Sequence, residues 1–162
     1  MMNNRIAMFP GTFDPPTKGH LNIIFRTAQL YDRLYVVVAD NIRKKCLFTA
    51  EERVGMLKQL LEGNSNIEVV SYQGLVVEFA KKNNIGVLVR GVRALADFNY
   101  EFELAMTNKE LCPELEIIFL PTDSHYFLLR SSSIKEIASF GGDVSNMVPE
   151  LVLNEIKKKL AK

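Results

Sequence analysis

The chain has 162 residues, which is enough for one domain with a substantial apolar core. Hydrophobic residues make up 48% and charged residues 24%, proportions that exclude a disordered chain. The formal net charge of +1 gives no overall attraction to nucleic acid or to an anionic membrane, so any anionic partner must be small and bound locally. No apolar run is long enough for a membrane span or a signal peptide, and we expect a single cytoplasmic domain over residues 1–162.

Short apolar runs alternate with helical patterns along the chain. The runs are typical of strands buried on both faces of a parallel sheet, and they cover residues 5–10, 34–39, 67–71, 86–89 and 116–120. Between them, apolar residues recur at spacings of three and four, which predicts helices within 21–31, 54–61, 76–80 and 95–105. This alternation predicts an α/β protein with a five-stranded parallel sheet flanked by helices.

Several helix ends can be placed from capping patterns. Thr49 and Glu52 have the spacing of a capping box at the start of the second helix. Ser133 and Glu136 have the same spacing, which predicts that Ser133 caps a helix late in the chain. Pro149 is expected to begin a closing helix, so that two C-terminal helices follow the last strand.

Cations and hydroxyls follow four of the predicted strands. Ligands of open parallel sheets bind beyond the carboxyl ends of the strands, and the segments there are 10–14, 40–45, 90–93 and 121–133. Because these ends meet at one edge, we expect one shared site. Its side chains, with His20, are those that bind polyphosphate: Thr12, Lys44, Lys45, Arg90, Arg93, Arg130, Ser131, Ser132 and Ser133.

The stretch PGTFDPPTKGH, residues 10–20, has two interpretations. Thr17, Gly19 and His20 would lie at a helix N-terminus, where free N–H groups favour anions and glycine permits close approach. Alternatively, His20 is structural and bonds only to its own helix cap. The stretch by itself does not decide between the two.

Other polar and apolar tracts also have two interpretations. Arg90 and Arg93 flank Gly91 at a strand end, and we favour a site over surface charge because of the flexible glycine between them. The tract HYFLL at 125–129 is either core packing or an apolar wall for a nucleobase. The helix predicted after Arg93 has one face that carries Asp97, Glu101, Leu104 and Asn108. Such a polar helix face is usually only solvated.

The sequence lacks the motifs of several common enzyme classes. There is no GxGxxG and no GxxxxGK[ST], which argues against a nicotinamide cofactor and a P-loop. GxSxG and HExxH are also absent, which lowers the priors for a serine hydrolase and a zinc protease. Cys46 and Cys112 are isolated and are expected to be reduced thiols.

Longer motifs carry a family resemblance. GTFDPPTKGH resembles the T-x-G-H signature of the nucleotidyltransferase superfamily, at Thr17 to His20. RGVRALADFNYE at 90–101 and SSSIKE at 131–136 are similar to the bacterial phosphopantetheine adenylyltransferase family in particular, and the likeness runs nearly end to end. It implies a Rossmann-like dinucleotide-binding fold and a homohexamer. It also implies Mg²⁺-dependent transfer of the adenylyl group of ATP to 4′-phosphopantetheine, with dephospho-coenzyme A and pyrophosphate as products and coenzyme A as feedback inhibitor.

The resemblance also implies residue roles. The residues that would meet phosphopantetheine are Thr12, Lys44, Val76 and Arg90. Those that would meet ATP are Thr12, Phe13, His20, Gly91, Val92, Arg93, Glu101, Tyr126, Phe127, Leu128, Leu129, Arg130, Ser131 and Ser132. Arg130 departs from the family pattern, because it stands where the first serine of a phosphate-binding trio is usual.

The chemistry fits these residue types. A phosphate nucleophile is largely ionised at neutral pH, so fixed positive charge matters more than a general base. We expect His20 to donate to the α-phosphate, Lys44 to shield the incoming phosphate, and Arg93 with the Ser131–Ser132 loop to hold the β- and γ-phosphates. Mg²⁺ is expected to stay with the phosphates and water, since no carboxylate cluster is evident.

Other functions compete with this one. Relatives in the superfamily transfer nucleotides to nicotinamide mononucleotide or to glycerol phosphate, and RGVRALADFNYE argues against them. A catalytically silent nucleotide-binding or assembly module would bind ATP without releasing pyrophosphate. A class I synthetase fragment is disfavoured because no second lysine loop and no tRNA-binding extension accompany the histidine.

Overall fold

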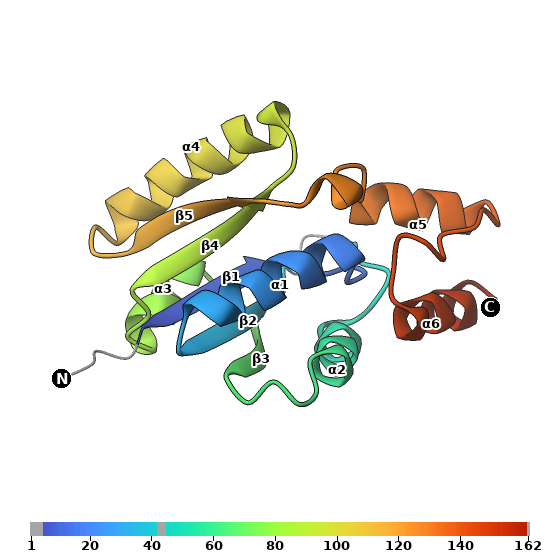
Figure 1. The fold of residues 1–162 in the computed structure, drawn as a ribbon, viewed down its shortest axis with the longest axis horizontal. Coiled ribbons are helices and arrows are strands. Elements are labelled where there is room, and N and C mark those ends of the chain that lie inside the picture. The colour runs from blue at the N-terminus through green and yellow to red at the C-terminus, as the bar shows by residue number, and fades with distance from the viewer. Residues whose placement is uncertain (1–4, 42–44, 162) are drawn as a thin grey trace.

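One parallel sheet organises the molecule. The computed structural model describes residues 5–41 and 45–161. The sheet has the strand order β3-β2-β1-β4-β5, and every neighbouring pair is parallel (Figure 1). This confirms the predicted five-stranded parallel sheet. Its strands are β1 (Ile6–Gly11), β2 (Arg33–Ala39), β3 (Ile67–Tyr72), β4 (Val87–Val92) and β5 (Glu116–Pro121).

Helices connect the strands and cover both faces of the sheet (Figure 1). A short 3-10 turn, η1 (Ser124–Tyr126), follows β5. The packed helices α5 and α6 then close the chain, with α6 also touching α2. The α-helices are α1 (Lys18–Leu30), α2 (Ala50–Leu60), α3 (Val76–Lys82), α4 (Leu95–Leu111), α5 (Ser131–Ser139) and α6 (Glu150–Leu160). No helix among the described residues is long and apolar enough to cross a membrane.

The strands are buried on both faces, as their continuous apolar runs predict. Along β1, Phe9 packs with Ile23 of α1 and Leu57 of α2 on one face. Met8, the next residue back, packs with Ala80 of α3 on the other. This alternation follows from the two-residue side-chain period of a strand, and it makes the central strand the meeting point of both cores.

Two predicted boundaries hold and two are wrong. Thr49 and Glu52 form the expected capping box, and α6 begins directly after Pro149. By contrast, α5 begins at Ser131 with Arg130 as its N-cap, so Ser133 is not a cap. Strand β4 continues to Val92, because the ladder with β5 extends to that residue, and the segment 90–92 therefore lies within the strand.

The orientation of α4 also differs from the prediction. Ala105 is buried as expected, but the Leu95 and Phe102 side chains of the same apolar stripe are 77% and 45% exposed. The face expected to be solvated turns inward, with Asn108 buried and Glu101 paired to Arg90 of β4. The inward arginine thereby gains a carboxylate partner from the helix.

Candidate active site

The turn from β1 into α1 places His20 at a helix N-terminus. Thr17 is the N-cap, and its side-chain oxygen accepts from the His20 backbone N–H at 3.2 Å. In return, the Thr17 backbone N–H donates to Nδ1 of the His20 ring at 3.0 Å. The histidine is therefore bonded to its own cap, but this cap uses only Nδ1. The structural and the ligand-binding interpretations are thus compatible.

The protonation state of His20 follows from its surroundings. Desolvation by burial, followed by the nearby charge of Arg93, lowers the pKa of His20 to about 4. The ring is therefore neutral at neutral pH. Since Nδ1 accepts from the backbone, the single ring proton lies on Nε2. His20 can thus offer a neutral N–H donor to an anion at the start of α1.

The Phe13 side chain packs against the His20 ring. Its ring is buried and meets the His20 ring edge-on, with centroids 5.0 Å apart. A Cβ at Gly11 would come within 2.9 Å of the Phe13 ring, so only glycine fits there without a shift. Because its side chain is packed in the core, Phe13 could meet a nucleotide only through its backbone.

Asp14 ties the same turn to two distant segments. Its buried carboxylate accepts from the backbone N–H groups of Leu47 and Phe48, each at 2.9 Å, and from Lys135 Nζ of α5 at 2.7 Å. The Ser131 hydroxyl adds a bond to the Pro15 carbonyl at 3.0 Å. The start of α5 is therefore fixed against the turn that carries Thr12 and His20.

Two arginines reach the site, Arg90 from within β4 and Arg93 from directly after it, each with a carboxylate partner. The Nε of Arg90 pairs with Glu101 of α4, and the Nη1 of the same arginine donates to the Pro10 carbonyl at 3.4 Å. The Nε of Arg93 pairs with Asp97 at 3.1 Å, and its Nη1 donates to the Leu129 carbonyl. These bonds join the ends of β1 and β4 to the segment that follows η1, as the topology predicts.

Gly91, between the two arginines, is needed for packing. A Cβ on it would lie 3.2 Å from the Ile23 side chain of α1, and it has an ordinary strand conformation. For this glycine the structure shows close packing against α1 rather than a special backbone conformation. The adjacent Val92 ends β4.

The segment 126–130 borders the start of α1. A Cβ on Gly19 would lie 3.5 Å from the Cβ of Tyr126, which shows how closely the two elements approach. Leu128 is 80% exposed and Phe127 is also exposed, so this tract is not core packing. Arg130 is half exposed, and its Nη2 lies 3.9 Å from Asp97. Ser132 is exposed in the first turn of α5, next to the free backbone donors of that helix.

Two predicted site residues are less well defined. Val76 begins α3 beyond the carboxyl end of β3, at the same edge of the sheet, and its side chain packs against the core on that face. Lys44 lies outside the described residues. Its neighbour Lys45 is exposed.

Sequence reasoning missed several residues that bond to the site residues and fix their positions. Asp14, Asp97 and Lys135 lie within the quoted motifs but were given no role in the site, and their roles become visible only through their partners. Arg53 is buried in α2 and was also missed, although its spacing from Ala50 and Met56 places it on the helix face that turns inward. A charge within an apolar helical stripe was the available signal.

The described residues offer no protein cage for a metal ion. No group of three or more His, Cys, Asp or Glu side chains comes together in ranges 5–41 and 45–161. The carboxylates nearest the candidate site already pair with Arg90, Arg93 and Lys135. A divalent cation would therefore need most of its ligands from a substrate and from water.

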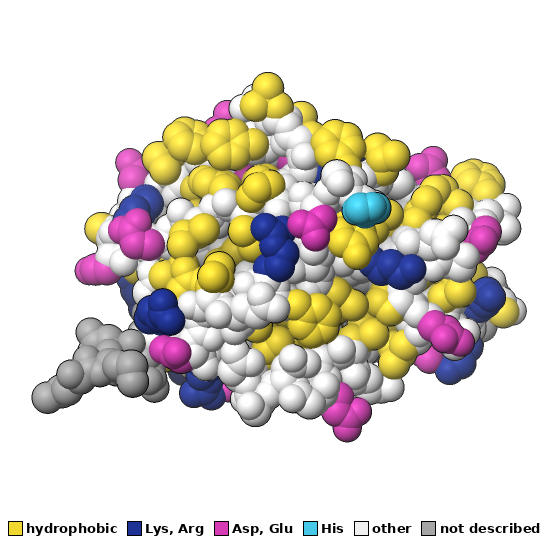
Figure 2. Space-filling model, viewed as in Figure 1, with side chains coloured by type: hydrophobic (Ala, Val, Ile, Leu, Met, Phe, Trp, Pro, Cys, Tyr) yellow, Lys and Arg dark blue, Asp and Glu magenta, His cyan; other side chains and the backbone are white. Residues whose placement is uncertain are grey.

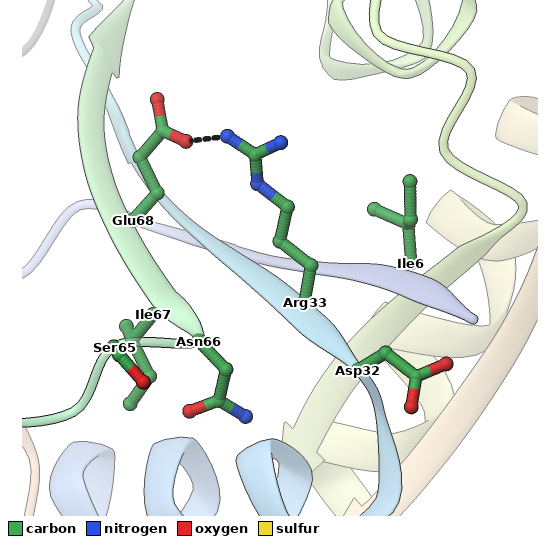
Figure 3. A pocket seen from close by; sticks show the side chains of 7 residues that line it. All are labelled: Ile6, Asp32, Arg33, Ser65, Asn66, Ile67 and Glu68. Carbon is green, nitrogen blue, oxygen red and sulfur yellow. Dashed lines mark hydrogen bonds and ion pairs between the residues drawn. The ribbon is translucent and has the colours of Figure 1, made fainter. Parts of the chain in front are cut away.

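A separate recess lies at the opposite edge of the sheet (Figure 3). It has a volume of about 380 Å³ and is lined by the starts of β2 and β3, including Asn66 and Ile67. An ion pair between Arg33 and Glu68 spans these strands. Because it faces the amino ends of the strands, the recess is separate from the candidate site.

Comparisons with known proteins identify a family model and full-length relatives. Residues 8–137 match the cytidylyltransferase-like family. A phosphopantetheine adenylyltransferase from Carboxydothermus hydrogenoformans is 49% identical over 158 residues, covering 98% of each chain. Those from Alkaliphilus metalliredigens and Dictyoglomus thermophilum are 45% and 46% identical, covering 96% and 94% of this chain and 99% and 93% of theirs.

A solved structure supports the fold. A Vibrio parahaemolyticus protein, provisionally assigned as a nicotinate-nucleotide adenylyltransferase, superposes with a TM-score of 0.68 at 20% identity over 97% of this chain and 96% of its own. With the full-length relatives above, the sheet topology and the T-x-G-H turn, the chain belongs to the phosphopantetheine adenylyltransferase family.

Proposed function

We propose that the chain transfers the adenylyl group of ATP to 4′-phosphopantetheine, giving dephospho-coenzyme A and pyrophosphate. The neutral His20 ring, with its Nε2 proton at the start of α1 and two arginines nearby, is the observation that carries this proposal. The names of the full-length relatives support the choice of acceptor. The reaction would be a late step in the biosynthesis of coenzyme A.

The reaction needs positioned charge and no general base. An oxygen of the acceptor phosphate, whose second pKa is about 6, attacks the α-phosphorus of ATP. The bond from that phosphorus to the bridging oxygen breaks, and pyrophosphate leaves with the electron pair. His20 Nε2–H donates to the α-phosphate oxygens as charge builds on them. Because His20 is already neutral and oriented by Thr17, the donor needs no reorganisation.

The acceptor would lie between β1 and β4. Thr12 would meet the transferring phosphate, and Arg90, held by Glu101, would neutralise the acceptor phosphate. Lys44, in the segment after β2, would shield the negative charge of the incoming phosphate. Val76 would contact the pantetheine arm.

The nucleotide would lie along the opposite side, against α1 and α5. Arg93 and the first-turn N–H groups of α5 would hold the β- and γ-phosphates, with Arg130 adding a further charge. The exposed apolar tract 126–129 would cover the adenine ring, while Gly91 and Val92 would meet it through the backbone. Glu101 would act through Arg90.

Magnesium would enter with ATP. The described residues lack a cage of their own, so we propose that Mg²⁺ is held mainly by the phosphates and water. When bound, it would neutralise charge on the β- and γ-phosphates, alongside Arg93.

We also propose that the protein is a homohexamer that acts in the cytoplasm and is inhibited by coenzyme A. Exposed apolar side chains on α4 support self-association, and hydrophobic side chains gather over this helix in Figure 2. Coenzyme A contains the same phosphopantetheine arm as the product, so it would compete at the acceptor site. Added coenzyme A should therefore raise the apparent KM for phosphopantetheine.

A pyrophosphate-release assay tests the reaction. The protein should release pyrophosphate from ATP only when 4′-phosphopantetheine is present, and not with nicotinamide mononucleotide or glycerol phosphate. ATP binding without pyrophosphate release on any acceptor would support a silent binding module instead.

A further inference from the structure

Arg53 of α2 is the most deeply buried cation among the described residues. It is 1% exposed and lies on the helix face that also buries Met56 and Leu57. A guanidinium in such surroundings is costly unless its charge and its N–H groups are matched. An apolar side chain would fill this place without that cost. Its partners therefore indicate what it does.

Three of these partners lie at the ends of the central strands. Nη1 donates to the Thr12 carbonyl at 2.8 Å and more weakly to the Ala39 carbonyl at 3.5 Å. Nη2 pairs with the Asp40 carboxylate at 3.2 Å. The side chain thus bridges the residue that follows β1 and the two residues at the end of β2. Asp40 is itself oriented by Gln73 Nε2 at 2.8 Å.

The Nε–H anchors the guanidinium to the start of its own helix. Nε donates to the Phe48 carbonyl at 3.1 Å and to the Thr49 carbonyl at 3.2 Å. Phe48 also donates its backbone N–H to the Asp14 carboxylate, so it is an acceptor for Arg53 and a donor to Asp14. The turn after β1 and the start of α2 are therefore tied together in both directions.

The turn at Thr12 needs such support. The next residue, Phe13, has a φ of 51°, a left-handed conformation that non-glycine residues adopt at a cost in backbone energy. The peptide group between Thr12 and Phe13 carries the carbonyl that Arg53 holds. Without this bond, the peptide could rotate and displace the Thr12 side chain from the ligand edge.

We propose that Arg53 is a positioning residue for adenylyl transfer, which fixes the Thr12 peptide against Asp40 and so holds Thr12 where the transferring phosphate passes. Arg53 is buried behind the site and would contact neither substrate. This inference rests on the proposed function, because it gives Thr12 a role in the reaction. The fork geometry matters, since a lysine could keep the charge but could not bridge Thr12, Asp40 and the α2 start together.

The test compares Arg53→Met, Arg53→Lys and the parent in pyrophosphate release. Arg53→Met should lower kcat at least tenfold and change the KM for ATP less than threefold. Arg53→Lys should recover part of the lost kcat. Titration calorimetry should find the same number of ATP sites per chain in all three, which separates mispositioning from a loss of folded protein. Leu115→Ala is the stability control, because Leu115 is buried just before β5 at the far edge of the sheet, and its kcat should match the parent.

The outcomes separate the two proposals. A parent without pyrophosphate release overturns the proposed function and this inference together. An active parent, with kcat of a folded Arg53→Met within twofold of it, overturns only the role of Arg53. If Arg53→Met does not fold, a folded Arg53→Lys with the kcat of the parent overturns the role equally.

Discussion

Among single residues, His20 both completes the N-terminal cap of α1 and offers a donor to the candidate site. One ring nitrogen accepts from the Thr17 backbone, and the other carries the proton. The low pKa near 4 keeps the ring neutral, so it can lie among cations such as Arg93 without repulsion. A lysine in this place would add charge but would not keep one fixed donor direction.

Replacing His20 tests this donor. His20→Ala should lower kcat about a hundredfold or more, because one preorganised donor to the charged transition state is lost. His20→Gln should retain more activity, since its side-chain amide can present an N–H near the position of Nε2. Steady-state pyrophosphate release measures both. A kcat for His20→Ala within a few-fold of the parent would contradict the role.

The same residue should make stability depend on pH. The pKa of histidine is 6.5 in the unfolded chain and about 4 for His20 in the fold. Between these values the unfolded state binds more protons, so stability is full above pH 6.5 and is lost as the pH falls toward 4. Between pH 7.5 and 4.5, His20→Gln should lose about 2 kcal/mol less unfolding free energy than the parent. Urea denaturation at both pH values measures this, and equal losses would argue against a neutral buried His20.

Arg130 offers a prediction specific to this chain. Its half-exposed guanidinium lies near Asp97 and the start of α5, so Arg130→Ser should weaken ATP binding about fivefold, as expected for one partly screened charge. The loss should shrink at high salt. Calorimetry measures both affinities, with Lys158→Ser on the exposed face of α6 as the control. Unchanged affinity would place Arg130 outside the phosphate site.

Among the elements, the two capping boxes form a natural pair. Thr17 caps α1 and Thr49 caps α2 with the same reciprocal bonds. Thr17→Ala and Thr49→Ala should each cost about 1 kcal/mol of stability. Only Thr17→Ala should also lower kcat, because its partner at the third helical position is His20. Thermal unfolding together with pyrophosphate release checks this, and an equal kcat for the two variants would separate the α1 cap from catalysis.

The elements also show what the sequence could predict. Buried parallel strands are continuous apolar runs, so all five strands were predictable. The Thr49 cap was predictable from its spacing to Glu52. The length of β4 was not, because its ladder with β5 continues past Arg90, whose charge is matched by Glu101 of α4, a contact that no local pattern records. For the same reason the inward face of α4 was read as solvated. Ser133 was taken for a cap although α5 starts at Ser131, since serines repeat there and tertiary contacts choose among them.

Within the candidate site, residue types were easier to predict than partners. The convergence of residues 10–14 with 90–93 and 121–133 follows from topology alone, and the contacts of Arg90 and Arg93 bear it out. The carboxylates that hold these arginines, and the buried Arg53, depend on side-chain packing across elements, which spacing does not encode.

At the scale of the whole molecule, α4 carries an exposed apolar stripe. Met106 is 47% exposed and lies on the same side of the helix as Leu95 and Phe102. A second copy of the chain would cover this stripe.

A charge on the stripe should therefore break the assembly. Met106→Glu should reduce the solution mass from that of an oligomer to that of smaller species, because a carboxylate would be buried without a partner. Sedimentation velocity measures the mass, and Phe140→Glu, at the exposed end of α5, is the matched control and should keep the parent mass. A parent that sediments as a monomer would overturn the proposed hexamer.

The bond between Asp14 and Lys135 has a consequence for how the protein is made. These residues are 121 positions apart, yet the carboxylate of one and the ammonium of the other meet behind the turn that carries Thr12. During synthesis the N-terminal half leaves the ribosome first, and Asp14 must wait for α5 before it gains its cationic partner. This part of the candidate site is therefore assembled only after residues as far as Lys135 have been made.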